Sequence, residues 1–169
     1  MKEYEYSVRV NNIKPFLDYC KKNGYLLNSE SKQNRIVYEN RNNRKILARI
    51  TTVERNGEKI TIFDCKNVEC GDSSLKVSKE SKEMIIDENN RTIIESMLDV
   101  MNFEKSADNL RIRYEYVKGD VKFEIDDYIR PVMKVVAIEG KPDLVDKIYQ
   151  EIINNVNIKS SIENLSKEQ

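Results

Sequence analysis

The chain has 169 residues, of which 34% are charged and 39% hydrophobic, a polar composition that still suits one globular domain. Its 29 basic and 29 acidic residues cancel, which argues against a general nucleic-acid binder, because such proteins depend on excess positive charge. The chain has no histidine and only three cysteines, so catalysis by a histidine base is excluded and a zinc site is disfavoured. It has no apolar run of roughly 20 residues and no apolar leader at its start, so we expect a cytoplasmic protein.

The first part of the chain alternates between strand and helix patterns. Strict alternation of polar and apolar residues predicts a strand over 3–10. Helical spacing follows over 13–23, where Asn12 can cap the start and Gly24 the end. Four strand-like runs come next, near 34–39, 44–52, 59–66 and 74–84.

The second part of the chain repeats this order. A helix is expected near 89–101, with Met97 and Met101 packed on its apolar side. Three strands follow, near 109–117, 120–127 and 133–139, and the last helix runs from Pro142 to about Val156. The pattern predicts an α+β fold with about eight antiparallel strands and three main helices. We expect one domain over residues 1–158 and a polar C-terminal tail over 159–169.

The polar faces of the predicted strands carry charges of both signs at successive same-side positions. Glu3, Glu5 and Arg9 form one such row, and Lys122, Glu124 and Asp126 form another. One interpretation is a solvated face with cross-strand ion pairs, each contributing about 0.2–1 kcal/mol. The other is a sheet curled into a tunnel with the charges inside, where carboxylates hold Mg²⁺ or Mn²⁺ and basic residues hold phosphates.

Several segments resemble one known family. Glu3-Tyr4-Glu5-Tyr6-Ser7 resembles the Glu-x-Glu-x-Lys signature of the CYTH superfamily, which includes class IV adenylyl cyclases, thiamine triphosphatases and inorganic triphosphatases. Later segments resemble the strands of that family in the expected order: Arg35-Ile36-Val37-Tyr38, Leu47-Ala48-Arg49-Ile50, Asp64-Cys65-Lys66, Leu110-Arg111-Ile112-Arg113, Glu124-Ile125-Asp126-Asp127-Tyr128 and Val136-Ala137-Ile138-Glu139-Gly140. The resemblance spans about residues 2 to 155 and implies an eight-stranded antiparallel β-tunnel with a charged interior and helices packed outside. In three places the sequence departs from the pattern: Ser7 stands for the signature lysine, Ala137 stands for the first glutamate of the closing pair, and the Leu-Arg-x-Arg strand keeps one basic residue, Arg49.

The resemblance also implies roles for individual residues. The expected metal site, for Mg²⁺ or Mn²⁺, consists of Glu3, Glu5, Asp126 and Glu139. The candidate catalytic residues are Glu5 and Glu124, either of which can orient a water molecule. The expected phosphate contacts are Arg9, Arg49, Lys66, Arg111 and Arg113. The secondary candidates are Arg35, Lys76, Glu80 and Lys105.

These residues predict a divalent-metal-dependent hydrolase of inorganic triphosphate, thiamine triphosphate or a nucleoside triphosphate. Two alternatives stay open: an adenylyl cyclase that makes cyclic AMP and pyrophosphate from ATP, and a module that binds a nucleotide or polyphosphate without turnover. Ser7 and Ala137 favour the binding module, because the signature lysine is associated with catalysis in the family. The expected partner is a small molecule containing a triphosphate, with no membrane and no nucleic acid polymer, and a homodimer is left open.

Overall fold

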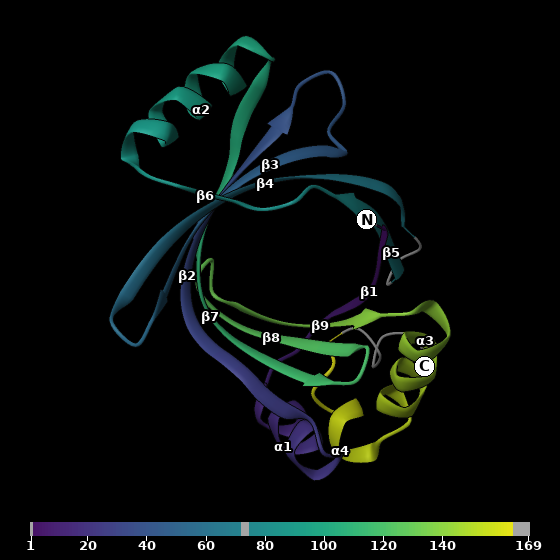
Figure 1. Cartoon of the computed structure of the whole chain (residues 1–169). Helices are drawn as coiled ribbons and strands as arrows, with labels where there is room; N and C mark the ends of the chain where they lie inside the picture. The colour runs from purple at the N-terminus through teal and green to yellow at the C-terminus, as the bar shows by residue number, and fades with distance from the viewer. Residues whose placement is uncertain (1, 72–74, 164–169) are drawn as a thin grey trace.

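The computed structural model describes residues 2–71 and 75–163, and that part of the chain forms nine strands and four helices (Figure 1). The strands are β1 (Lys2–Arg9), β2 (Leu26–Asn40), β3 (Ile46–Arg55), β4 (Glu58–Gly71), β5 (Leu75–Glu80), β6 (Met84–Ile86), β7 (Phe103–Lys118), β8 (Val121–Arg130) and β9 (Met133–Gly140). The helices are α1 (Lys14–Lys22), α2 (Glu88–Val100), α3 (Pro142–Ile153) and the short α4 (Val156–Lys159).

Eight of the strands form a closed antiparallel barrel. Their order around the ring is β3-β2-β7-β8-β9-β1-β5-β4, and pairing between β3 and β4 closes it. The ninth strand, β6, pairs with β4 beyond the end of β5. Figure 1 shows the ring with α1, α3 and α4 on one side and α2 on the other. The predicted α+β fold, with an eight-stranded antiparallel barrel and three main helices outside, is confirmed.

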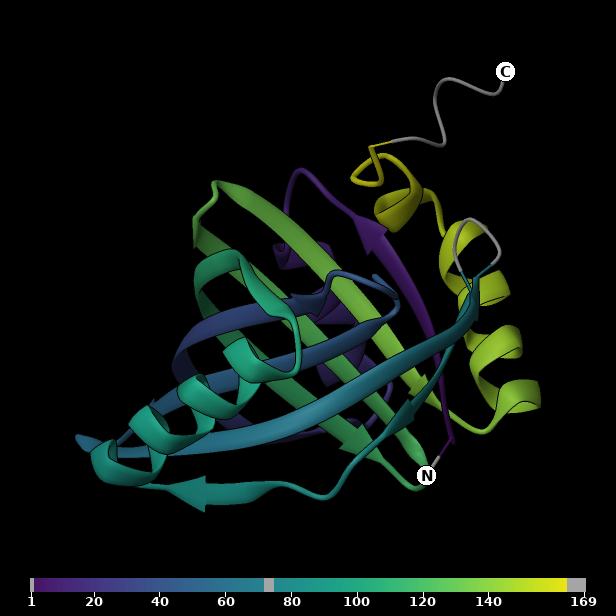
Figure 2. The same ribbon diagram turned by 90° about the horizontal axis from the view of Figure 1, so that it is seen from above.

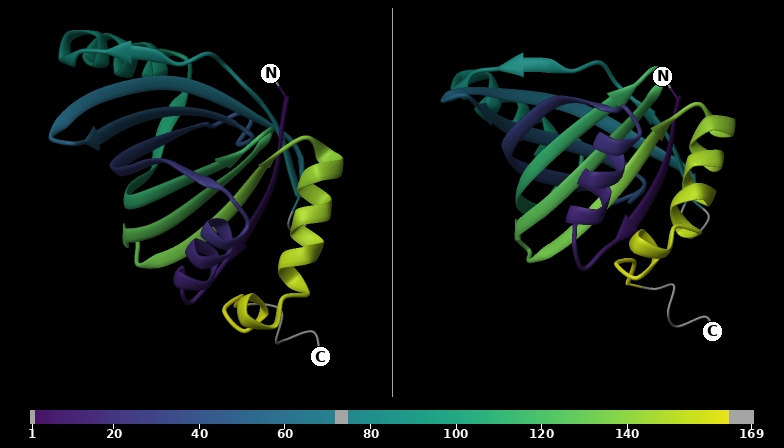
Figure 3. Two further views of the ribbon diagram at one scale, coloured as in Figure 1. Left: turned by 60° about the horizontal axis from the view of Figure 1, so that its bottom comes forward. Right: turned by 90° about the horizontal axis from the view of Figure 1, so that it is seen from below.

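The hydrophobic cores lie between the helices and the outer surface of the barrel. The larger core joins α1 and α3 to β8 and β9, and its fully buried side chains include Phe16, Phe123, Ile125 and Val136. Figure 3 shows α1 and α3 on the same outer side of the barrel. Because alternate strand residues point to opposite faces, packing the apolar face under helices turns the charged face inward.

A smaller core lies under α2, on the part of the barrel away from α3 (Figure 2). Ile94 and Leu98 of α2 pack on Ala48 and Ile50 of β3. The prediction that Met97 and Met101 pack against the protein is wrong, since 55% and 54% of their surfaces are exposed. The reason is geometric: α2 contacts the barrel along one narrow face, so its second apolar stripe points outward.

Several strand boundaries differ from the prediction. β2 begins eight residues before the predicted start at residue 34, and β7 begins at Phe103, although residue 109 was predicted. The predicted strand 74–84 is two strands, β5 and β6, which pair with different stretches of β4. The start of that predicted strand, residue 74, lies outside the described residues.

The segment after α4 packs on the barrel as far as residue 163. Ile162 is buried, and it pairs with Val10 in an isolated β-bridge. The predicted polar tail from 159 onward therefore has a packed first part, because Ile162 contributes to the larger core. Residues 164–169 of that tail lie outside the described residues. In the part of the chain that the structure describes, no helix combines the length and apolar content that crossing a membrane requires.

Candidate functional site

The barrel surrounds a cavity of about 1100 Å³. Charged side chains from all eight ring strands line it, and the described lining contains nine basic and nine acidic residues. The charged faces of the strands therefore point into the barrel, and the alternative interpretation of a solvated outer face is wrong. The strand register places opposite charges next to one another: Glu5 lies opposite Lys76 on β5, and Glu139 lies opposite Lys122 on β8.

Arg113 forms the most strongly paired group in the cavity. Its guanidinium donates to both carboxylate oxygens of Asp126, at 2.7 and 2.8 Å, and forms an ion pair with Glu124. Burial opposes the charge on Arg113, but Glu124 and Asp126 outweigh it and raise the pKa of the guanidinium. Asp126 is thus held by arginine in this arrangement, as Glu124 is, so both carboxylates position this cation.

Arg111 has mainly neutral partners. It donates twice to the amide oxygen of Gln33, at 2.8 and 3.2 Å, and once to the hydroxyl of Tyr128, at 2.8 Å. The nearest carboxylate oxygen, on Asp126, is 3.6 Å away and is shared with Arg113. Arg111 is almost completely buried, so its positive charge is fixed in place but only partly balanced.

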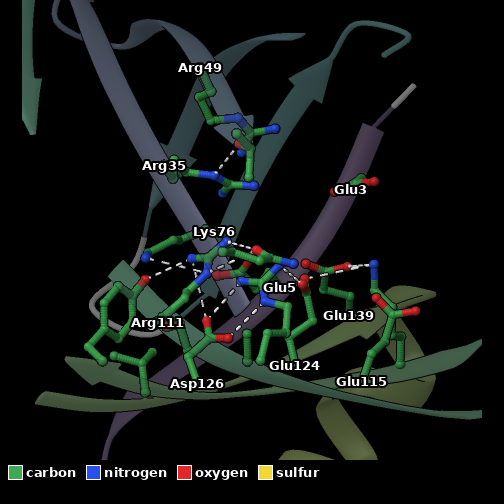
Figure 4. Close-up of a pocket in the computed structure, with 18 of the residues that line it drawn as sticks. Glu3, Glu5, Arg35, Arg49, Lys76, Arg111, Glu115, Glu124, Asp126 and Glu139 are labelled. Carbon is green, nitrogen blue, oxygen red and sulfur yellow. Dashed lines mark hydrogen bonds and ion pairs between the residues drawn. The ribbon is translucent and has the colours of Figure 1, made fainter. Parts of the chain in front are cut away.

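Arg35 has a single hydrogen-bond partner and no ion pair among the described residues. Its Nε donates to the hydroxyl of Thr51 at 3.0 Å, and no carboxylate of the described chain lies within ion-pair distance of it. Burial, followed by repulsion from Arg111, Arg49 and Arg113, lowers its pKa to about 9. Figure 4 shows Arg35 directed toward the group that contains Arg111, Glu124 and Asp126. Arg35 is half-buried in the cavity wall, and a cation partly removed from water without a counterion is stabilised by an anion, so this position favours a bound anion.

A second ion-pair group lies on β3, β4 and β5. Arg49 donates to Asp64 through two nitrogens and to Glu80 at 3.2 Å, while Lys66 lies 2.8 Å from Glu80. Burial alone would raise the pKa of Glu80, but Arg49 and Lys66 lower it. These charges balance within the group, so it holds the wall of the cavity together and adds little net potential.

The carboxylates gather on the β1–β9–β8 side of the cavity. Glu124 and Glu139 are close enough to interact directly, and Lys122 lies 2.8 Å from Glu139 and 3.7 Å from Glu124. Burial and the contact with Glu124 hold the pKa of Glu139 well above its usual range. Glu5 is the cross-strand neighbour of Glu139, and burial, then Glu80, also raises the pKa of Glu3. Two adjacent carboxyl groups need a shared proton or a cation between them.

The donor set of this carboxylate side fits a hard divalent cation. Carboxylate oxygens from Glu5, Glu124 and Glu139 suit Mg²⁺ or Mn²⁺, and no imidazole competes for a softer metal. Within residues 2–71 and 75–163, no three acidic or cysteine side chains form a ready-made metal site. Mg²⁺ commonly takes only one or two protein carboxylates and completes its shell with phosphate oxygens and water, so the arrangement is compatible with metal brought in together with a phosphate ligand.

Comparison with known proteins relates the chain to others by its fold. No protein-family model and no curated protein matches the sequence. Among solved structures, the PH1012 protein of Pyrococcus horikoshii has a TM-score of 0.72 and 16% identity, over 95% of this chain and 94% of that chain. HpAC1 of Hippeastrum, a proposed adenylyl cyclase with a dominant triphosphatase activity, has a TM-score of 0.63 and 12% identity, over 98% and 93%. A proposed adenylate cyclase of Vibrio parahaemolyticus has a TM-score of 0.62 and 15% identity, over 98% and 95%.

The chain has the fold of the CYTH, or triphosphate tunnel, proteins. The resemblance noted in the sequence motifs is thereby confirmed at the level of the fold. The predicted site residues are spread along the chain, yet thirteen of the fourteen line one tunnel: Glu3, Glu5, Arg9, Arg35, Arg49, Lys66, Lys76, Glu80, Arg111, Arg113, Glu124, Asp126 and Glu139.

Lys105 is the predicted site residue that does not reach the tunnel. It is exposed on β7 and lies 3.6 Å from Asp108. The pairing of β2 with β7 shifts register between Val37 and Tyr38, and the partner on β7 changes from Ala107 to Lys105. Such an irregularity interrupts the strict alternation of faces, so counting back by twos from Arg113 gives the wrong side for Lys105.

The prediction missed three uncharged members of the tunnel lining, Gln33, Thr51 and Tyr128. Gln33 and Tyr128 hold Arg111, and Thr51 accepts from Arg35. A search for charged rows does not detect neutral acceptors. The signal that identifies them is their position, because each lies two residues along the strand from a charged lining residue and therefore on the same face.

Proposed function

We propose that the protein binds a triphosphate together with a divalent metal inside the tunnel and hydrolyses it. The observation that carries this proposal is the environment of Arg35: a half-buried cation with no carboxylate partner among the described residues, close to Arg111 and adjacent to a group of carboxylates. An anion that carries a bound divalent metal can interact with both parts of the site, the anion with the arginines and the metal with the carboxylates. A metal-free polyanion would meet a lining whose formal charges cancel.

The basic residues divide into two groups by their partners. Arg35 and Arg111 have neutral hydrogen-bond partners and are the main phosphate contacts, with Arg9 and Lys76 beside them in the lining. Arginine suits this role because its planar donors match phosphate oxygens in pairs. Arg49, Lys66 and Arg113 are held by carboxylates, so they shape the potential of the tunnel and orient their neighbours.

Glu5, Glu124 and Glu139 are the residues that would hold the metal. When bound there, Mg²⁺ or Mn²⁺ neutralises phosphate charge and polarises a phosphoryl oxygen. Burial disfavours ionised Glu124, but Arg113 and Lys122 are among the neighbours that hold its pKa below the usual range, so it stays an acceptor that can orient water. The described ion-pair contact of Glu5 is long, 4.0 Å to Lys76, which leaves it able to take part as the second acceptor.

Two of the departures from the CYTH pattern, Ser7 and Ala137, lie opposite each other. Ser7 of β1 pairs with Ala137 of β9, and Ala137 pairs on its other side with Glu124 of β8. Glu124 therefore supplies a carboxylate from the neighbouring strand, next to the position where the pattern has one on β9. This supports retained activity, because the loss of a carboxylate at Ala137 is offset locally.

Binding without turnover is the second candidate, and Ser7 is the observation that favours it. Ser7 has a hydroxyl where the pattern has the lysine, and the lining cations near it along the strands are Arg9, two residues further on β1, and Lys76 of β5, which pairs with Glu5. Cyclisation of ATP ranks below hydrolysis, because HpAC1, which shares the fold, is described as a proposed cyclase whose dominant activity is that of a triphosphatase.

Product analysis tests the proposal. The purified protein is incubated with Mg²⁺ or Mn²⁺ and, separately, with inorganic triphosphate, thiamine triphosphate and ATP. We expect release of orthophosphate, and we expect Glu5→Gln and Glu139→Gln to abolish it while the circular dichroism spectrum stays unchanged. Cyclic AMP with pyrophosphate would instead identify a cyclase. Binding of a triphosphate without formation of a product would identify the protein as a module that binds without turnover.

A further inference from the structure

Next to Arg111, one part of the tunnel lining is apolar. Tyr128 of β8 and Met133 of β9 are direct cross-strand neighbours, and both line the cavity. Val135 lies two residues from Met133, on the same face, and also lines the cavity. We call Tyr128, Met133 and Val135 the apolar patch. All three are half-buried, so their remaining exposed surface faces the lumen.

The apolar patch is directly connected to the proposed phosphate contacts. The Tyr128 hydroxyl accepts from Arg111 at 2.8 Å, and the Arg111 guanidinium carbon lies 5.6 Å from the centre of the Tyr128 ring. Val135 is the cross-strand neighbour of Arg9 on one side and of Asp126 on the other. A ligand whose phosphates contact Arg111 or Arg9 therefore places whatever is attached to its phosphate chain beside the apolar patch.

We infer that the tunnel selects a triphosphate ester carrying an organic group with an apolar or aromatic face, which the apolar patch holds, over inorganic triphosphate. This inference rests on the proposed triphosphate site. Inorganic triphosphate has only charged oxygens, so it gains nothing from apolar surface, whereas an attached ring removes that surface from water. Met133 suits such a contact, because its flexible thioether packs well against an aromatic ring.

The test compares two ligands that share a triphosphate chain, which is free in one and esterified to an organic group in the other. Methylene-bridged analogues of ATP and of inorganic triphosphate, which resist cleavage, are titrated calorimetrically into the protein with Mg²⁺. We expect the ATP analogue to bind about fivefold more tightly or better, which corresponds to burial of about one to two methylene groups. Thiamine triphosphate, added as a competitor, distinguishes a thiamine from a purine nucleoside as the organic group.

Variants assign the preference to the apolar patch. Met133→Gln keeps the length of the side chain but makes it polar, and we expect it to remove the preference while the affinity for the inorganic analogue changes less than about twofold. Val135→Thr, which is nearly isosteric, serves as a second variant if Met133→Gln is unstable. Val132→Gln is the matched control, because Val132 is on the same hairpin but 85% exposed. Tyr128→Phe keeps the ring and removes the hydroxyl from Arg111, so it should weaken both ligands equally.

The outcomes separate this inference from the proposed function. Equal affinity of the wild-type protein for the two analogues, or an equal loss for both in Met133→Gln, would overturn the inference and leave the triphosphate site standing. Failure of both analogues to bind in the presence of Mg²⁺ would overturn the proposed function and the inference together.

Discussion

Arg35 and Arg113 line the same tunnel but differ in their surroundings. Arg113 is saturated by Glu124 and Asp126, whereas Arg35 donates only to a threonine hydroxyl among the described residues. The same substitution should therefore have different effects at the two positions. At Arg35 we expect it to weaken ligand binding, and at Arg113 we expect it to lower the stability of the fold.

At Arg35 we expect Arg35→Gln to weaken binding of inorganic triphosphate by about tenfold to a hundredfold, because a hydrogen bond to a charged group contributes about 1.5–3 kcal/mol. The free energy of unfolding should stay level or rise, because the substitution removes a partly buried charge that has no carboxylate partner among the described residues. Calorimetric titration and urea unfolding measure the two effects. Arg35→Lys, which keeps the charge but loses the planar donors, should fall between wild type and Arg35→Gln. Unchanged affinity in Arg35→Gln would remove this residue from the phosphate site.

At Arg113 we expect Arg113→Gln to lower the free energy of unfolding by about 3–5 kcal/mol, since it leaves two buried carboxylates without their cation. Urea unfolding is the measurement. Arg55→Gln is the control, because Arg55 is an exposed arginine at the end of β3 and should change stability by about 0.5 kcal/mol or less. If the two variants lose the same stability, the ion pairs of Arg113 are not structural.

Glu139 gives the site a pH dependence. Its pKa in the folded protein is above the value of 4.5 for an unperturbed glutamate, because of burial and of Glu124. Its contribution to stability is therefore fully present below the unfolded pKa, and it is lost as the pH rises through the folded pKa. We expect the stability of the metal-free wild-type protein, measured relative to Glu139→Gln, to fall as the pH increases from about 4.5 into the neutral and alkaline range. Urea unfolding of both proteins across this range measures the difference, and a constant difference would contradict the shared-proton arrangement.

At the scale of single elements, α2 has two apolar stripes, one buried against the barrel and one exposed. Leu98, 2% exposed, packs on β3, whereas its neighbour Met97 points outward. We expect Leu98→Ala to lower the free energy of unfolding by about 2–5 kcal/mol, because it opens a cavity under the helix. Met97→Ala is the matched control and should change it by about 0.5 kcal/mol or less. Equal losses, measured by urea unfolding, would mean that the outer stripe of α2 is covered in solution.

Strand β2 shows why some element boundaries were not predicted. In β2, the early residues Ser29, Ser31 and Gln33 are buried although they are polar, because that part of the strand faces a polar interior. Their outer neighbours are polar as well, so the usual alternation of apolar and polar residues is absent. The turn between β7 and β8 is marked in the sequence by Gly119, which lies between two strand patterns. In the structure Gly119 adopts the positive φ of +56° that this turn requires.

At the scale of the whole molecule, the tunnel lining is neutral in formal charge, but its cations differ in how closely carboxylates compensate them. A triphosphate entering without metal gains from Arg35 and Arg111 but is repelled by Glu5, Glu124 and Glu139. We expect a chelating agent to weaken triphosphate binding at least about tenfold, and restoring Mg²⁺ or Mn²⁺ to recover it. Calorimetric titration with and without chelator measures this effect. Full affinity without metal would mean that the carboxylates position cations only.

The sequence by itself determined the order of most strands and helices, the charged rows on one face of each strand and the motif set that resembles the CYTH proteins. These features are local, because alternation along a strand and periodicity along a helix depend on neighbouring residues. Only the tertiary structure decided that the charged faces turn inward, that Asp126 is bound to Arg113, that Lys105 is outside and that Arg35 has no counterion among the described residues. Those outcomes depend on ring closure between strands far apart in the chain, since closure sets which charges share a low-dielectric interior and which remain in water.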